Sequence, residues 1–112
     1  MSETKPTAAE IAAEPAGRRM DGWIVAYVLN TSRYPARYST NKIDAFCVLD
    51  YLQRSDDIDY SEWSIEYKYG CYYDVHVLVT LGENTYSARG LGDTMALAIC
   101  RALLALFCVE MA

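Results

Sequence analysis

The hydrophobic positions in the first half of the chain recur at helical spacing. A stripe with steps of three and four residues ends before Asn30 and consists of Met20, Trp23, Ile24, Tyr27 and Val28. A second stripe consists of Ala45, Val48, Leu49 and Leu52. Ser39 or Thr40 precedes it, and a hydroxyl there can accept hydrogen bonds from free amides at a helix start. The pattern predicts two helices, the second capped by one of these hydroxyls.

After residue 59 the hydrophobic period shortens to two, which is typical of half-buried strands. One face of the first predicted strand carries Trp63, Ile65, Tyr67 and Tyr69. Gly70-Cys71 follows as a hairpin tip, and one face of the second strand then carries Tyr73, Val75, Val77, Val79 and Leu81. A turn at residues 82–84 leads into a short third strand at residues 85–88. Three strands joined by tight turns predict an antiparallel meander.

The last segment, residues 95–107, is apolar almost all the way round, with Arg101 as its only charge. Such a helix is expected to be buried on more than one side. Its apolar run falls short of the ~20 residues that span a bilayer, so we expect a core helix and no membrane association. Leu97 and Leu104 face away from the side of Ala98, and either the N-terminal helix or a second subunit must cover them. We predict a homodimer through this helix.

The predicted order is helix, helix, three strands and helix, which is an α+β fold with helices packed on a three-stranded antiparallel meander. The last two helices can cover one face of the sheet, and the N-terminal helix the other face or an edge. Residues 1–15 are expected to form a flexible N-terminal arm or at most one loose turn. Residues 16–112 are expected to form a single domain.

Charge and composition narrow the class of partner. The formal net charge is −5, and the ten basic residues are scattered along the chain. Nucleic acids and anionic membranes draw much of their affinity from clustered Lys and Arg, so a protein partner is favoured over both. The polar start of the chain lacks an apolar core segment, so we expect a cytoplasmic protein.

The chain carries no recognisable catalytic or metal-binding motif. Cys47, Cys71, Cys100 and Cys108 form neither a CxxC nor a Cys/His pair. His76, the only histidine, shares a strand face with Asp74, but no nucleophile can be placed beside it from sequence. We therefore expect no enzyme, no cofactor and no metal, and interpret His76 as a residue of a polar face.

Glycines just before the last helix form a candidate ligand site. Gly90 and Gly92 bracket a turn, and Asp93 or Thr94 can cap the helix that follows. Free amides at such a turn can bind an anion, although a tight strand-to-helix connection explains the same glycines. The candidate ligand-binding residues are Gly90, Gly92 and Asp93.

Ten tyrosines in 112 residues indicate a recognition surface, because tyrosine buries a large area while keeping a polar tip. Not all of them can be core residues. Ile43, Cys47 and Tyr51 lie toward the second side of their predicted helix and hint at a further contact surface. The candidate partner-binding residues are Tyr34, Tyr38, Tyr60, Tyr72, His76, Leu97 and Leu104.

Three segments resemble the phage ABA-sandwich domain, a family of small proteins encoded by bacteriophages and prophages. They are Glu10-Ile11 with Pro15 to Asp21, then Tyr38-Ser39-Thr40, and Ala98 to Ala102. The resemblance implies a layered sandwich of sheet and helices, a phage origin and action in the bacterial host cytoplasm. It implies no activity and no site residues.

Three functions follow as hypotheses. The leading one is a small phage-encoded binding protein that occludes or sequesters a host protein, for instance a bacterial defence factor. The second is a binder of a small anionic ligand or nucleotide signal at the glycine turn. The third is nucleic-acid binding, since the predicted order is also that of double-stranded-RNA-binding domains, but Asp93, Thr94 and Met95 stand where those domains place lysines.

Overall fold

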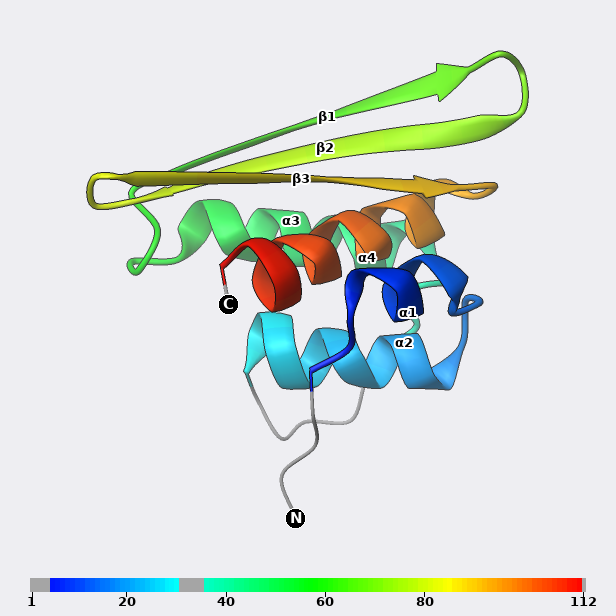
Figure 1. The fold of residues 1–112 in the computed structure, drawn as a ribbon, viewed down its shortest axis with the longest axis horizontal. Coiled ribbons are helices and arrows are strands. Elements are labelled where there is room, and N and C mark those ends of the chain that lie inside the picture. Colours follow the sequence, from blue (N-terminus) through cyan, green and yellow to red (C-terminus); the bar gives the residue numbers. More distant parts are fainter. Residues whose placement is uncertain (1–4, 31–35, 112) are drawn as a thin grey trace.

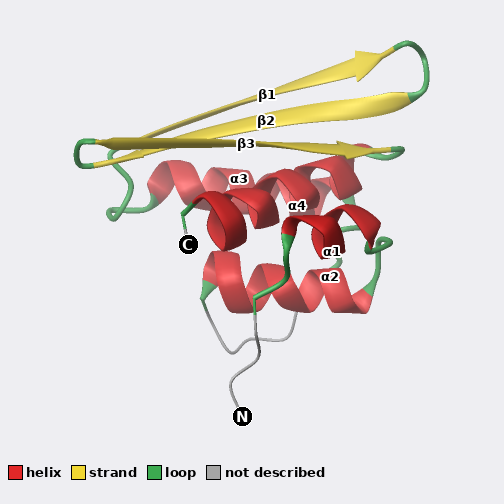
Figure 2. Cartoon of the chain, in the orientation of Figure 1, coloured by secondary structure: helices red, strands yellow, loops and turns green. Residues whose placement is uncertain are grey.

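Helices pack against one face of a three-stranded antiparallel sheet (Figures 1 and 2). The computed structural model describes residues 5–30 and 36–111. Its elements are α1 (Ala8–Ala13), α2 (Arg18–Trp23), the π-helical η1 (Ile24–Leu29), α3 (Lys42–Arg54), β1 (Tyr60–Lys68), β2 (Tyr72–Leu81), β3 (Asn84–Gly92), α4 (Met95–Ala105) and the π-helical η2 (Leu106–Glu110). The predicted α+β fold and its order of helices and strands are confirmed, with α1 as an additional short helix.

The molecule is layered in the order sheet, helices, helices. In Figure 1 the sheet lies on one side, α3 and α4 form the middle layer, and α1 with α2 and η1 lies beyond them. The expectation that the N-terminal helix covers the sheet's other face or an edge was wrong, because α2 and η1 lie on the far side of α4. A helix that is apolar all round needs cover on both sides, and α4 takes it from the sheet and from η1. The sheet's outer face carries no helix of the described chain.

The centre of the core is α4. Ile99, Leu103 and Leu104 are fully buried, as are the valines that β2 turns toward the helices, Val75, Val77 and Val79. Leu97 and Leu104 are 7% and 0% exposed within the single chain. They offer no surface to a second copy, so their assignment as partner-binding residues was wrong. The N-terminal helix, which was one of the two covers considered, contacts α4 through η1, and Leu97 also lies beside Gly92 of β3.

The third strand is longer than its pattern suggested, and it includes both candidate glycines. β3 continues to Gly92, with Ala88, Gly90 and Gly92 buried on the face toward α4. A Cβ on Gly90 would lie 2.2 Å from the Ala102 amide nitrogen and 2.3 Å from the Ala98 carbonyl oxygen. These glycines therefore allow a close approach of helix and sheet, and the predicted turn at Gly90 and Gly92 was wrong, because both residues lie in β3.

The first 15 residues are not a uniform arm. Residues 8–13 form α1, and its start is a capping box in which the Glu10 amide donates to Thr7 Oγ1 while Glu10 Oε1 accepts from the Thr7 amide. Ile11 is buried to 2% exposure in the core. The prediction of a flexible arm was wrong for this segment, because one apolar side chain and a full set of caps fix the short helix.

Ser39 has a role that its hydroxyl alone did not reveal. α3 is capped by Asn41, whose side chain accepts from the amides of Ile43 and Asp44, so the predicted cap at Ser39 or Thr40 was wrong. Ser39 is fully buried, and its hydroxyl donates to Asp21 Oδ1 at 2.6 Å and accepts from the Gly17 amide at 2.8 Å. This network ties the start of α2 to the chain segment before α3.

Candidate protein-binding surface

The start of α4 is not built as an anion site. The Thr94 hydroxyl caps the helix by accepting from the Leu97 amide at 3.2 Å. Asp93 is exposed beside this end and adds a negative charge. An anion would meet an occupied amide and a carboxylate of like charge, so the geometry does not support ligand binding by Gly90, Gly92 and Asp93.

The tyrosines predicted to bind a partner do not form one surface. Tyr34 lies outside the described residues, and Tyr38 is half-buried against the core. Tyr60 and Tyr72 lie on the outer face of the sheet, at opposite ends of the β1–β2 pairing. Tyr60 is exposed and donates to Glu62 Oε2 at 2.9 Å. His76 is exposed between these two ends.

The outer face of the sheet is polar and organised around Asp74. Arg89 pairs with both oxygens of Asp74, and the Lys68 Nζ lies 3.1 Å from Asp74 Oδ2. The Arg89 hydrogen bonds, with help from Lys68, hold the pKa of Asp74 below its ordinary value, although burial acts in the opposite direction. The cluster fixes the three strands to one another across their polar face.

His76 faces two strands on this same outer face. Ser64 is its cross-strand neighbour on β1 and Arg89 its neighbour on β3. Within the described residues no hydrogen bond joins His76 to either side chain, and all three are exposed. The arrangement lacks the oriented nucleophile and base pair that hydrolytic catalysis requires.

Large apolar side chains gather on the opposite face of β1 and the adjoining side of α3. Ile43 is 67% exposed, Tyr67 57% and Trp63 38%. The Phe46 and Trp63 rings lie 5.5 Å apart between centroids, which joins the helix to the strand. We define the β1 aromatic surface by the residues Ile43, Phe46, Trp63, Ile65, Tyr67 and Tyr73.

The protrusion of the β1–β2 hairpin exposes this surface. Figure 1 shows that the hairpin extends past the helix layer at its tip. Tyr69 and Gly70 make the turn with φ of 57° and 64°, so Tyr69 belongs to the turn and not to the predicted strand face. Tyr67 packs against Tyr73, with ring centroids 4.7 Å apart and ring planes tilted by 43°. Its strand position faces the helix side, but at this end of the hairpin the helices no longer cover it.

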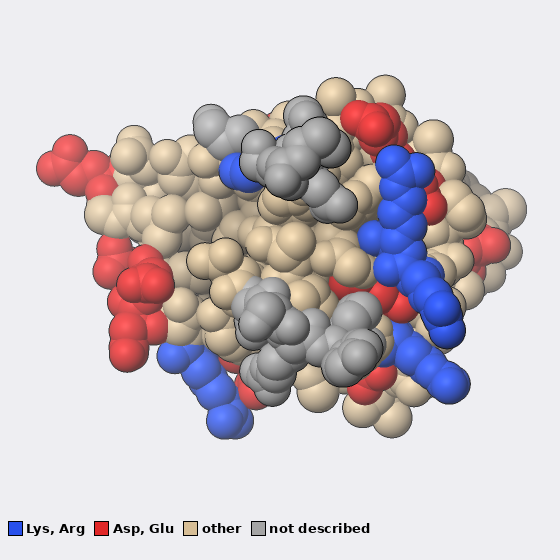
Figure 3. All heavy atoms as spheres, turned by 90° about the horizontal axis from the view of Figure 1, so that it is seen from below, with Lys and Arg blue, Asp and Glu red and all other residues tan. Residues whose placement is uncertain are grey.

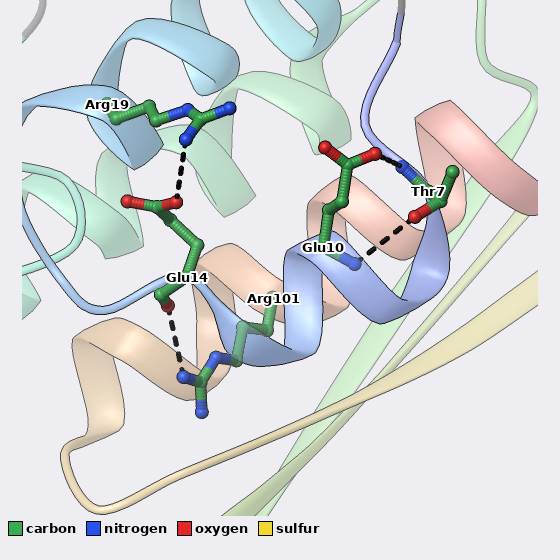
Figure 4. Close-up of polar contacts among 5 residues, drawn as sticks. All are labelled: Thr7, Glu10, Glu14, Arg19 and Arg101. Atoms are coloured by element: carbon green, nitrogen blue, oxygen red, sulfur yellow. Dashed lines mark hydrogen bonds and ion pairs between the residues drawn. The ribbon is translucent and has the colours of Figure 1, made fainter.

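The other edge of the sheet is closed at the C-terminal end of β3. Arg101 of α4 reaches out between α1 and β3, where its Nη1 donates to the Leu91 carbonyl at 2.8 Å. Its Nη2 donates to the Glu14 carbonyl at 3.1 Å, and the Glu14 carboxylate pairs with Arg19 at 3.5 Å (Figure 4). One charged side chain thus satisfies a carbonyl of β3 and anchors the end of α1 beside it.

A cavity of about 670 Å³ lies at the end of the molecule where both π-helical segments finish. Its walls include Val28, Leu29, Leu52, Ile58, Phe107 and Met111. Among the described residues that line it, Lys5 and Asp57 are the charged ones and have opposite signs. The cavity has the size of a small-molecule pocket, but its described lining lacks the clustered cations that a nucleotide phosphate needs.

Charges of both signs are mixed on the helical face of the molecule. Figure 3 views this face from the side opposite the sheet, and its basic side chains lie near acidic ones at the periphery. A line of basic side chains runs along one side of this face, and acidic side chains lie directly beside it. Because charges of both signs are interleaved, this face lacks the uniformly basic footprint of a nucleic-acid-binding face.

The thiols divide into a buried and an exposed pair: Cys100 and Cys108 are buried, and Cys47 and Cys71 are exposed. Burial, with a smaller effect of Asp21, raises the pKa of the Cys100 thiol, and burial also raises the pKa of Cys108. Across residues 5–30 and 36–111, side chains of His, Cys, Asp and Glu nowhere gather in groups of three that could hold a metal ion. In the same ranges, no helix combines the length and the apolar character needed to cross a membrane.

Sequence reasoning indicated only part of the β1 aromatic surface. The second side of α3 was recognised from Ile43, Cys47 and Tyr51, and all three are exposed. Exposure of Trp63 and Tyr67 was missed, because strand alternation identifies a face but not how far the helices cover it.

Comparisons with known proteins leave the family open. No protein-family model, no curated protein and no solved structure matches the chain. The resemblance to the phage ABA-sandwich domain therefore stays a prediction.

Proposed function

We propose that this chain is a non-enzymatic protein-binding domain that uses the β1 aromatic surface to occupy a surface of a partner protein. In line with the resemblance to phage domains, the proposed partner is a protein of the bacterial host, and the effect on it is steric occlusion or sequestration. A host defence factor is one such partner.

The observation that carries the proposal is the exposure of joined aromatic side chains. Isolated apolar residues are common on protein surfaces, but a contiguous group on two elements marks an interaction site. Trp63 lies against Phe46 of α3, and Tyr67 lies against Tyr73 of β2. Of these four rings, those of Trp63 and Tyr67 are exposed, and both lie on the same face of β1. Tyrosine and tryptophan supply most of the binding energy at many interfaces because they bury large areas with few rotatable bonds.

The overall charge supports a partner with a basic or neutral surface. With a net charge of −5, association with a basic protein surface is accelerated by electrostatic attraction, while nucleic acid is repelled. The position of Asp93 beside the start of α4 disfavours the double-stranded-RNA-binding mode for the same reason.

Affinity capture from a bacterial lysate with three forms of the protein tests the proposal. The double variant Trp63→Ser, Tyr67→Ser removes exposed rings from β1. Leu91→Ser removes an exposed apolar side chain from β3, where Leu91 is 49% exposed, and is the matched control. We expect the unmodified protein and Leu91→Ser to retain the same partner at moderate salt, and the double variant to lose it.

Two results would contradict the proposal. One is capture of identical proteins by all three forms. The other is loss of the partner in Leu91→Ser but not in the double variant. Circular dichroism of each form shows that the variants remain folded.

A further inference from the structure

The free edge of β1 is long and unprotected. β1 pairs with β2 along its whole length, from Tyr60 opposite Thr80 to Lys68 opposite Tyr72. Along its other edge, the described residues supply no further strand. Proteins usually shield such edges with charged side chains, proline, a short strand, a bulge or a covering helix. The charges of β1 are Glu62, Glu66 and Lys68, which all lie on the outer face of the sheet. The nine residues of β1 contain no proline and no glycine.

The sequence of β1 is complementary to itself in one antiparallel register. When two copies pair about Ile65, Glu62 of one copy lies opposite Lys68 of the second copy, and the same contact repeats by symmetry. On the other face, Trp63 lies opposite Tyr67 of the second copy, and Ile65 lies opposite itself. The register therefore pairs opposite charges on one face and aromatic rings on the other.

Neighbouring registers that keep the same faces together lack this match or shorten the pairing. Pairing about Tyr67 also sets Glu66 opposite Lys68, but only residues 66–68 of the two strands then overlap. Pairing about Ser64 places Glu62 opposite Glu66 of the second copy, and pairing about Glu66 places that residue opposite itself. Like charges directly opposite one another destabilise a strand pair. Pairing about Trp63 moves Lys68 past the end of the strand, so that it loses its opposite charge.

We infer that two copies of this chain associate through their β1 edges in the register centred on Ile65, forming one continuous sheet across both copies. The inference rests on the proposed function, because it joins two β1 aromatic surfaces into one binding face. It replaces the predicted dimer through α4, whose Leu97 and Leu104 are buried in the single chain.

Charge exchange tests the edge and its register together. Glu62→Lys places lysines opposite each other in both symmetric contacts, and Lys68→Glu does the same with glutamates. Because Lys68→Glu also removes the ion pair between Lys68 and Asp74 of the same chain, circular dichroism first confirms that this variant is folded. We expect each variant alone to weaken the dimer by roughly tenfold. An equimolar mixture of the two restores every opposite pair and is expected to form a heterodimer. Glu83→Lys, at an exposed turn, makes the same charge change away from β1 and leaves the dimer intact.

Sedimentation equilibrium gives the masses of the unmodified protein, each variant and the mixture. Support requires twice 12.6 kDa for the unmodified protein, loss in both single variants and recovery in the mixture. A monomer of 12.6 kDa throughout overturns the inference, as does a dimer that Glu62→Lys and Glu83→Lys affect equally. A monomer that still captures its partner through Trp63 and Tyr67 overturns this inference but leaves the proposed function standing.

A symmetric cross-link tests the register alone. In a Cys47→Ser, Cys71→Ser background, Ile65→Cys places two thiols directly opposite each other at the two-fold axis, within reach of a disulfide. Ser64→Cys is the matched control, because its thiol faces Glu66 of the second copy. Rapid oxidative dimerisation of Ile65→Cys alone supports the register, and preferential cross-linking of Ser64→Cys contradicts it.

Discussion

The two edges of the sheet differ in how far the rest of the chain covers them. At the β3 edge, glycines let α4 approach closely, and Arg101 binds the Leu91 carbonyl. Arg101 also binds the Glu14 carbonyl just after α1 (Figure 4). At the β1 edge, Trp63 and Tyr67 are exposed and the hairpin extends past the helices (Figure 1). A sheet with one closed and one open edge limits pairing to a single side, which favours a defined complex over open-ended aggregation.

The largest expected effect on the free energy of unfolding comes from a substitution in β3, the strand at the closed edge. Gly90→Ala places a Cβ inside the backbone of α4 and is expected to lower the free energy of unfolding by about 3 kcal/mol. Urea denaturation measures the change. Gly22→Ala is the opposite control: its Cβ meets nothing within 4 Å, and a helical alanine is expected to stabilise by about 0.5–1 kcal/mol. Equal effects of the two substitutions would contradict the close packing of α4 on β3.

Arg101→Met opens the closed edge without removing α4. It deletes the hydrogen bonds to the Leu91 and Glu14 carbonyls, and we expect a loss of about 2 kcal/mol. Arg54→Met, which breaks only an exposed ion pair with Asp50, is expected to cost less than about 0.5 kcal/mol. Hydrogen exchange of the α1 amides is expected to accelerate in Arg101→Met but not in Arg54→Met. Unchanged exchange there would mean that Arg101 does not anchor α1.

The open side is expected to tolerate substitution. Tyr67→Ser removes a ring that is 57% exposed and is expected to cost about 1 kcal/mol or less, while partner capture falls. Tyr73→Ser removes the other ring of the same pair, which packs against the core, and is expected to cost about 2 kcal/mol. The melting temperatures of the two variants show which substitution lowers stability more. A larger loss in Tyr67→Ser would show that its ring serves stability and not binding.

The smallest expected effect on stability near neutral pH is that of Asp74, on the outer face of the sheet. Arg89 and Lys68 lower the pKa of Asp74 in the folded state, so the folded state is stabilised while Asp74 is ionised. This contribution is complete above the unfolded pKa of about 3.9 and is lost as the pH falls through the lower folded value. The unfolding free energy is expected to fall more steeply below about pH 4 in the unmodified protein than in Asp74→Asn. Parallel curves would contradict the assignment.

Periodicity predicted the fold because the core obeys it. The stripes through Val48 and Val75, and the apolar C-terminal helix, each bury the side that the pattern indicated. The β3 glycines were misread because a glycine before a helix is equally consistent with a turn and with close packing. Gly90 and Gly92 continue the spacing of two residues that begins with Tyr86 and Ala88, and this spacing was the available signal for a longer strand.

The binding surface and the polar network were harder to predict, since both depend on tertiary contacts. The burial of Ser39 comes from residues near Gly17 and Asp21, more than 15 positions away in the chain. The exposure of Trp63 and Tyr67 depends on where the helix layer ends, which no local pattern encodes. The same alternation of apolar and polar residues would also fit a strand whose apolar face the helices cover along its whole length.

Hydrogen exchange of the two sheet edges at low and high protein concentration tests the central claim most directly. If β1 is the edge that associates, amide protection of residues 61–67 increases with concentration while that of β3 stays constant. Concentration-independent exchange in β1, or new protection confined to β3 and α1, would contradict the account of an open and a closed edge.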